Sequence, residues 1–160
     1  MNTQKWIDLN KIFISLPATS ILALCAYGEA RGEGPEGIKA VLNVMNNRVV
    51  HRGWFIEKEI AKLSSDYHGV ILKPFQFSCF LPKDPNREKL LTMANSIINA
   101  TADNSAFVLC LDLSVKMIQG VLEDNTLGAL YYHTKQIHPK WADSFVKTVE
   151  IGNQIFYKEV

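Results

Sequence analysis

The spacing of apolar residues along the chain predicts a mainly helical protein. Residues 20–28 and 35–50 place apolar or small side chains at positions i, i+3, i+4 and i+7, the spacing of one buried helix face. We expect Thr19 or Ser20 to cap the first of these helices. The second opens with proline, which is tolerated at the first helical position. Between them, the glycine-rich segment 28–37 predicts a break.

The rest of the chain predicts three further helices and a small β part. A short helix is expected over 54–62, and longer ones over 86–100 and 104–122. Proline and glycine interrupt residues 63–85, where short strands and loops are expected. The segment FVKTVEIGNQIFY predicts a terminal hairpin that turns at Gly152-Asn153. The pattern therefore indicates a mainly α (α+β) fold with a small β-hairpin region.

Composition narrows the class of protein and its partners. The 160 residues are 48% hydrophobic and 21% charged, which is ordinary for one globular domain and argues against disorder. Lysine and arginine total 17 against 16 acidic residues, and the basic residues are scattered. Such a balance gives no electrostatic attraction to nucleic acid. We expect a monomer that does not bind nucleic acid.

The apolar stretch Ile12–Ala26 is the one candidate for targeting or membrane insertion. It is 15 residues long, short of the roughly 20 residues that a spanning helix needs. Lys11 precedes it, which leaves a signal peptide open, but Pro17 breaks it. We therefore expect synthesis in the cytoplasm without a clear signal peptide, and no stable membrane anchoring.

Cysteine and histidine usage favours neither a disulfide framework nor a metal centre. Cys25, Cys79 and Cys110 are odd in number and far apart, so we expect small buried thiols. No HExxH motif is present, and we expect no metal and no cofactor. A nucleophilic pair of Cys79 with His133 would be the arrangement of a cell-wall peptidase, although nothing local marks Cys79 as activated.

Glu29 is the candidate general acid. It follows the apolar run ILALCAYG and precedes a glycine-rich turn with room for a bulky polymer. Cleavage of a glycosidic bond needs a carboxyl group that stays protonated near neutral pH, and partial burial raises a carboxyl pKa. The alternative is that Glu29 only caps its helix or pairs with Arg31 or Arg48. Glu33 and Glu36 compete for the catalytic role but suit structural ones.

Two further segments carry side chains suited to carbohydrate. FQFS alternates as a strand would, which places Gln76 and Ser78 on one side, where an amide and a hydroxyl can bond sugar groups. In the run ALYYH, Tyr131 and His133 share one side of a strand and Tyr132 lies on the other. Each segment also fits an ordinary half-buried strand, so both interpretations stay open.

Four segments occur in a distinctive order over roughly residues 20–157: AYGEARGEGPEGIKAVLNVMNNRV, FQFSC, GALYYHT and IGNQIFY. Together they resemble the cell wall hydrolase family of spore-cortex-lytic enzymes (SleB-like), which also includes phage endolysins. The resemblance implies a lysozyme-like catalytic domain over 20–160, behind an N-terminal extension of residues 1–19. The first Glu of the family's EARGE motif is catalytic and falls on Glu29. The family's closing motif has His where this chain has Gln154.

The resemblance also implies a reaction on peptidoglycan glycan strands, at the β-1,4 bond between N-acetylmuramic acid and N-acetylglucosamine. Hydrolysis by an N-acetylmuramidase needs a second carboxylate. Asp66, Asp84 and Glu33 are the nearby candidates, and the two aspartates lie in sequence typical of solvated surface. We therefore favour a lytic transglycosylase that forms 1,6-anhydro ends. A non-catalytic binding module is a further alternative. The expected role is that of a phage endolysin, which reaches the periplasmic cell wall after holin-type release.

Overall fold

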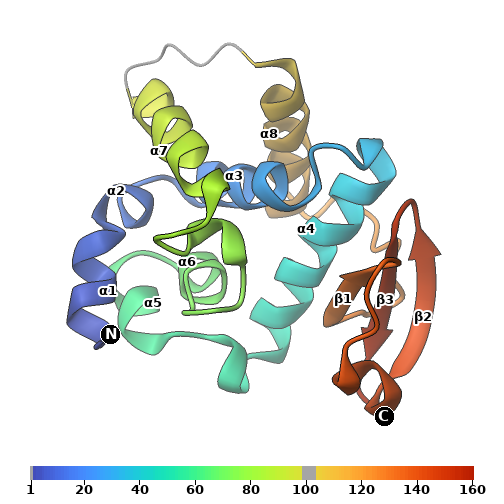
Figure 1. The fold of residues 1–160 in the computed structure, drawn as a ribbon. Helices are drawn as coiled ribbons and strands as arrows, with labels where there is room; N and C mark the ends of the chain where they lie inside the picture. The colour runs from blue at the N-terminus through green and yellow to red at the C-terminus, as the bar shows by residue number, and fades with distance from the viewer. Residues whose placement is uncertain (1, 99–103) are drawn as a thin grey trace.

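Helices make up most of the chain, and a small sheet lies at its C-terminal end (Figure 1). The computed structural model describes residues 2–98 and 104–160. Its elements are α1 (Thr3–Leu9), α2 (Lys11–Ile14), α3 (Ala18–Ala30), α4 (Gly34–His51), η1 (Gly53–Phe55), α5 (Lys58–Leu63), α6 (Asp66–Ile71), η2 (Ser78–Phe80), α7 (Pro85–Ile98), α8 (Ser105–Ile118), β1 (Tyr131–Thr134), η3 (Lys140–Ser144), β2 (Val146–Ile151) and β3 (Gln154–Lys158), where η marks a 3₁₀ helix. The predicted mainly α fold with a small β part is confirmed.

Helix α3 is the centre of the helical part, with α7 and α8 above it and α6 below it in Figure 1. Every side chain from Ser20 to Tyr27 is buried, because α4, α6, α7 and α8 pack around the helix. A helix that is apolar on all sides is typical of a protein core. The chain enters α3 from Pro17, and no side chain caps the helix. The predicted cap at Thr19 or Ser20 is wrong because the helix already begins at Ala18.

The first two helices pack on the same core as α3. Trp6 and Phe13 are buried in it, and the indole nitrogen of Trp6 donates a hydrogen bond to the carbonyl of Leu72 (2.6 Å). The predicted break at Pro17 is confirmed, since α2 ends before it and α3 begins after it. The boundary between extension and domain at residue 19 stays a prediction. Among the described residues, no helix has the length and apolar character to cross a bilayer.

Helix α4 lies between the helical core and the sheet (Figure 1). Ala40 and Val44 on its outer face pack against Ala129 and Phe156, which belong to the sheet side. The three strands are antiparallel in the order β1-β3-β2. The β2–β3 hairpin turns at Gly152, whose positive φ of 57° favours glycine, so the hairpin prediction is confirmed. This arrangement leaves β1 beside α4.

Residues 63–85 form α6, a turn and η2, so the short strands predicted here, including the one at FQFS, are wrong. The backbone N–H of Gln76 donates to the carbonyl of Lys73 (3.2 Å), and Phe75 has a φ of 67°. A proline followed by a residue of positive φ is the pattern of a type II turn. The turn leaves Phe75 80% exposed while Phe77 is buried. The rings of Phe75 and Phe77 therefore do not lie on the same side of the segment, as they would in a strand.

The other predicted helices are present with shifted ends. Helix α5 begins at Lys58, after η1, and α7 begins at Pro85. Residues 99 and 100 of the predicted helix 86–100 lie outside the described residues. Helix α8 is capped by Asn104, whose side-chain oxygen accepts from the backbone N–H of Phe107 (3.1 Å). It ends at Ile118 because Gly120 adopts a φ of 75°.

Candidate active site

Glu29 lies near the C-terminal end of α3 with its side chain half-buried. The pKa of its carboxyl is raised from 4.5 to about 7, chiefly by burial and next by the negative charge of Asp84. The charge of Arg48 and hydrogen bonds with Tyr132 and Cys79 act in the opposite direction. The effect of burial on the pKa is larger than the effect of these contacts. A carboxyl with this pKa is protonated in a large share of molecules at neutral pH.

A close approach between α3 and η2 builds the surroundings of Glu29. A Cβ on Gly28 would lie 2.9 Å from Cys79 Sγ and 3.0 Å from its Cβ, so only glycine allows this approach. Cys79 Sγ lies 3.9 Å from Glu29 Oε1. The glycine before the acid thus brings the FQFSC segment against it.

Glu29 forms no ion pair within the described residues. Arg31 donates to the carbonyl of Tyr27 (3.3 Å) and to the side-chain oxygen of Asn86 (3.0 Å). Arg48 Nε donates to the carbonyl of Leu130 (2.8 Å). The alternative role of Glu29 as a salt-bridge partner of either arginine is therefore not found.

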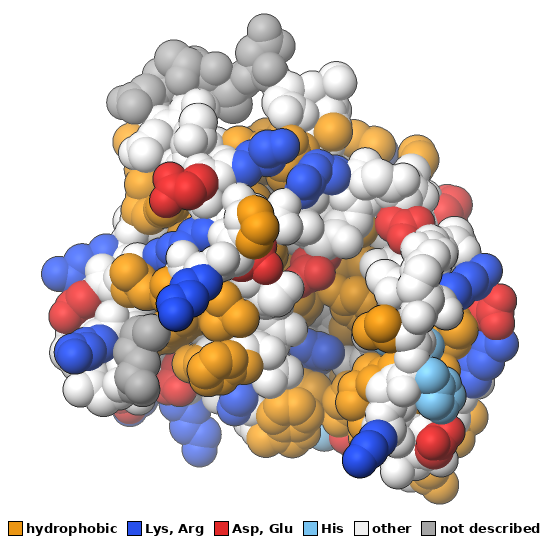
Figure 2. Space-filling view, viewed as in Figure 1, with side chains coloured by type: hydrophobic (Ala, Val, Ile, Leu, Met, Phe, Trp, Pro, Cys, Tyr) orange, Lys and Arg blue, Asp and Glu red, His pale blue; other side chains and the backbone are white. Residues whose placement is uncertain are grey.

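Glu29 lines one of two hollows in this part of the molecule, and Tyr132 lines the other. The first, which we call the aromatic groove, has a volume of about 440 Å³ and is lined by Arg48, Trp54, Phe75, Gln76, Tyr131, Tyr132, Trp141 and Phe145. The second is a polar hollow of about 470 Å³, lined by Gly28, Glu29, Ala30, Arg31, Gly32, Glu33, Asn86 and Asn153. The two hollows share no lining residue, but the side chain of Tyr132 in the aromatic groove is close enough to Glu29 in the polar hollow to lower the pKa of its carboxyl. Figure 2 shows the molecular surface hollowed between the helical part and the sheet, with hydrophobic and acidic side chains along it.

The groove walls come from segments far apart in the sequence. Trp54 belongs to η1, Phe75 and Gln76 to the turn after α6, and Trp141 to η3. Tyr131 of β1 stacks on Phe145 with ring centroids 4.3 Å apart. Flat aromatic faces of this kind pack well on sugar rings. The groove is therefore suited to a polysaccharide strand.

The structure places three of the five predicted glycan contacts in the aromatic groove: Gln76, Tyr131 and Tyr132. Ser78 is exposed at the start of η2 and does not line the groove. His133 is buried, with its nitrogens within 2.9 Å of the Tyr157 hydroxyl and 2.7 Å of the Thr134 carbonyl. Contact of any of the five with glycan stays a prediction.

The sequence did not predict five of the residues that line the aromatic groove: Arg48, Trp54, Phe75, Trp141 and Phe145. Trp54 and Phe75 could have been selected as large apolar side chains in turn-rich sequence. The burial of Arg48 depends on packing between α4 and β1, which no local pattern reveals.

The candidate second carboxylates have separate environments. Asp66 pairs with Arg52 (2.6 Å), and Glu33 accepts from the backbone N–H of Asn153 (3.1 Å). Asp84 is half-buried, accepts from the backbone N–H of Asn86 (2.8 Å) and raises the pKa of Glu29. The prediction that Asp84 is merely solvated surface is therefore wrong, because the turn before α7 brings it toward the acid.

The Cys–His pair of the peptidase alternative does not form. Cys79 contacts Glu29, whereas His133 bonds Tyr157 and Thr134. All three cysteines are free and buried, as predicted. Over residues 2–98 and 104–160, no group of three His, Cys, Asp or Glu side chains is placed to hold a metal ion.

Gln154 occupies the position at which the family resemblance expects His. It begins β3, is 2% exposed, and its side-chain oxygen has no hydrogen-bond partner among the described residues. It lines neither hollow at Glu29.

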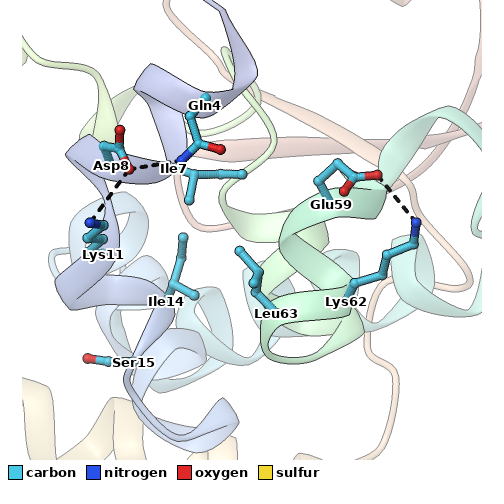
Figure 3. A pocket seen from close by; sticks show the side chains of 9 residues that line it. All are labelled: Gln4, Ile7, Asp8, Lys11, Ile14, Ser15, Glu59, Lys62 and Leu63. Carbon is cyan, nitrogen blue, oxygen red and sulfur yellow. Dashed lines mark hydrogen bonds and ion pairs between the residues drawn. The ribbon is translucent and has the colours of Figure 1, made fainter.

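A third hollow lies away from Glu29, between the first two helices and α5 (Figure 3). Its charged side chains are paired with one another, Lys11 with Asp8 (3.6 Å) and Lys62 with Glu59 (3.3 Å). The remaining lining is mostly apolar. We therefore assign no catalytic or binding role to this hollow.

Comparison with known proteins supports the interpretation of the motifs. The sequence profile of the family described as Cell Wall Hydrolase matches residues 32–157, which begins three residues after Glu29. A search of curated proteins finds no match. Two solved structures have a similar fold at 24% identity over 88% of this chain. They are the catalytic domain of the germination-specific lytic transglycosylase SleB from Bacillus anthracis (93% of that chain, TM-score 0.56) and that of the Bacillus cereus SleB protein (89%, TM-score 0.57). Since the profile spans most of the sequence, the chain belongs to the cell wall hydrolase family.

Proposed function

We propose that the protein cleaves the β-1,4 bond between N-acetylmuramic acid and N-acetylglucosamine in peptidoglycan, with Glu29 as general acid. The observation that carries this proposal is the carboxyl of Glu29, whose pKa is raised to about 7 in a polar hollow, next to Tyr132 of the aromatic groove. Membership of the cell wall hydrolase family supports the substrate class. One structural neighbour is titled a lytic transglycosylase, which supports the reaction type.

In the proposed reaction Glu29 serves first as acid and then as base. Its carboxyl protonates the glycosidic oxygen, the bond from that oxygen to muramyl C1 breaks, and N-acetylglucosamine leaves with the proton as a hydroxyl group. The Glu29 carboxylate then takes the proton of the muramyl C6 hydroxyl while that oxygen bonds to C1. The product is a 1,6-anhydro end, and Glu29 is again protonated.

Hydrolysis is the second candidate, because Asp84 is close enough to act on the pKa of Glu29. A hydrolase would use this second carboxylate to activate a water molecule or to form a covalent intermediate. Mass spectrometry of digested peptidoglycan separates the two reactions, since anhydro products are about 18 Da lighter. Reducing-end products, together with loss of activity in Asp84→Asn, would establish hydrolysis.

The catalytic role of Glu29 is tested by Glu29→Gln, which keeps the shape of the side chain but removes its titrating proton. Lysis of purified sacculi should fall at least about 100-fold, the low end of what acid catalysis contributes. Glu36→Gln removes an exposed carboxylate at the start of α4 and serves as the matched control, with near-normal activity. Near-normal lysis by folded Glu29→Gln would end this proposal.

Product analysis also separates the other classes of protein. A peptidase would release new amino groups and leave the glycan strands intact, and a binding module would release nothing. Cys79→Ala should leave the identity of the products unchanged if the glycan is the substrate.

The biological setting that we propose is host lysis by a phage endolysin monomer, made in the cytoplasm and admitted to the periplasmic wall by a holin. The support is the resemblance to a family that includes endolysins. Expression in a Gram-negative host with and without a holin tests it, because lysis should require both proteins. Lysis without the holin would show another route to the wall.

A further inference from the structure

Arg48 is buried at the aromatic groove with most of its hydrogen-bonding capacity unused. The residue lies on α4, lines the groove and is 6% exposed. Its Nε donates to the carbonyl of Leu130 (2.8 Å), but Nη1 and Nη2 have no hydrogen-bond partner among the described residues, and Nη1 is fully buried. A buried charged donor without a partner is costly, so such a group calls for an explanation.

The residues around the guanidinium of Arg48 hold it in place but accept no hydrogen bond from its Nη atoms. Its central carbon lies 5.2 Å from the ring centroids of Phe55 and Phe77, and 5.9 Å from that of Tyr131. These rings favour a cation but accept no conventional hydrogen bond from it. Burial lowers the pKa of Arg48, yet a guanidinium remains charged in proteins. Arg48 lines the groove, and its Nη2, which unlike Nη1 is not fully buried, is therefore a fixed donor there.

The groove favours a neutral acyl oxygen as the acceptor. Its other lining residues are mostly aromatic, which suits a methyl group and a sugar ring but provides little solvation for a second charge. Gln76 lines the same groove and can pair with an amide N–H. An acetamido group has all three parts: a methyl group, a carbonyl oxygen and an N–H.

We propose that Arg48 is the recognition residue of an N-acetyl subsite, in which its Nη2 donates to the acetamido carbonyl of a sugar beside Glu29. Naming peptidoglycan sugars as the ligand rests on the function proposed above. The subsite places the N-acetyl group between the aromatic walls and holds the strand in register with the acid. Arg48 is thus a binding and positioning residue, and the proton transfer remains with Glu29.

Binding of defined oligosaccharides tests the subsite without any turnover. The parent protein carries Glu29→Gln, and the probes are the fully N-acetylated hexamer of β-1,4-linked glucosamine and its fully deacetylated counterpart. Both are titrated at about pH 8, where the free amines are largely uncharged. Fluorescence of Trp54 and Trp141, which line the groove, reports binding. We expect the acetylated hexamer to bind at least about 10-fold more tightly.

Arg48→Lys in the same parent keeps the positive charge but loses the planar guanidinium and its Nη2 donor. Binding of the acetylated hexamer should weaken about 10- to 100-fold, the range for a lost hydrogen bond to a charged group, while the deacetylated hexamer changes less than about 2-fold. Arg52→Lys is the matched control, because Arg52 is exposed, pairs with Asp66 and lies outside the groove. It should leave both affinities unchanged.

Equal affinity of the parent for the two hexamers, or full affinity in Arg48→Lys, would overturn the proposal. If Arg48→Lys does not fold, the parent still decides the matter. The acetylated hexamer must then shift the ¹⁵N-labelled Nε–H signal of Arg48, assigned through its contact with Leu130, and an unmoved signal refutes the subsite. Normal lysis of sacculi by Glu29→Gln would refute the proposed catalysis but leave this binding result intact.

Discussion

The raised pKa of Glu29 predicts that the candidate acid destabilises the folded protein at neutral and alkaline pH. In the unfolded chain the carboxyl titrates near its ordinary value of 4.5, whereas in the folded protein its pKa is about 7. Between these values the folded state binds more protons, so the free energy of unfolding falls as pH rises. The stabilising contribution is fully present below about pH 4.5 and is lost by the time the pH has passed 7.

The size of this effect follows from the pKa values. At about 1.36 kcal/mol for each pKa unit, a rise from 4.5 to about 7 corresponds to about 3 kcal/mol as an upper value. Glu29→Gln is neutral at every pH and escapes the penalty. The variant should therefore gain about 2–3 kcal/mol over the wild type between pH 4 and pH 8, or roughly 4–12 °C in melting temperature at pH 8.

Urea denaturation of both proteins at several values from pH 4 to pH 8 measures the difference. All other titrating groups are shared, so the pH dependence of the difference isolates Glu29. Glu36→Gln controls for the loss of one negative charge and should show no comparable trend, since Glu36 is exposed. A difference between wild type and Glu29→Gln that is constant to within about 0.5 kcal/mol would show that the acid is not desolvated as described.

Three other substitutions have expected outcomes. Asp84→Asn removes the charge that raises the pKa of Glu29, so the alkaline limb of kcat/KM for lysis of sacculi should move to lower pH. Tyr132→Phe removes the hydroxyl group that lowers this pKa, and the same limb should move to higher pH; opposite shifts would contradict the assigned contacts. Phe13→Ala opens a cavity at a fully buried position and should cost about 3–5 kcal/mol in urea denaturation. A loss below about 1 kcal/mol would show that α2 is not part of the core.

Local sequence was sufficient for much of the fold. Helix α4 follows from apolar periodicity, and the β2–β3 hairpin follows from Gly152. The same spacing also locates helix α3, although the structure buries it on all sides. The strand expected at FQFS failed because Pro74 and the positive φ of Phe75 make a turn that periodicity does not register. The two aromatic residues that alternate in this segment are Phe75, whose ring is exposed, and Phe77, whose ring is buried in the core.

The candidate site likewise contains residues that the sequence identifies and relationships that only the structure reveals. Glu29 could be selected from its own surroundings, an apolar helix that ends in glycine-rich sequence. The influence of Asp84 on it arises from a tertiary contact between segments 55 residues apart, and the burial of Arg48 requires β1 against α4. No window of the sequence contains both partners of either relationship, so only the folded structure could reveal them.

The turn at Phe75 has a consequence for how the protein behaves in solution. A non-glycine residue with positive φ costs about 1 kcal/mol or more, and here it serves to display a ring that is 80% exposed. Phe75 and Trp54, which is 49% exposed, together form an exposed apolar rim of the aromatic groove. On an insoluble polymer such a rim slows desorption between successive encounters. In a concentrated stock free of polymer, we expect the same two exposed rings to make transient contacts between molecules that are otherwise monomeric.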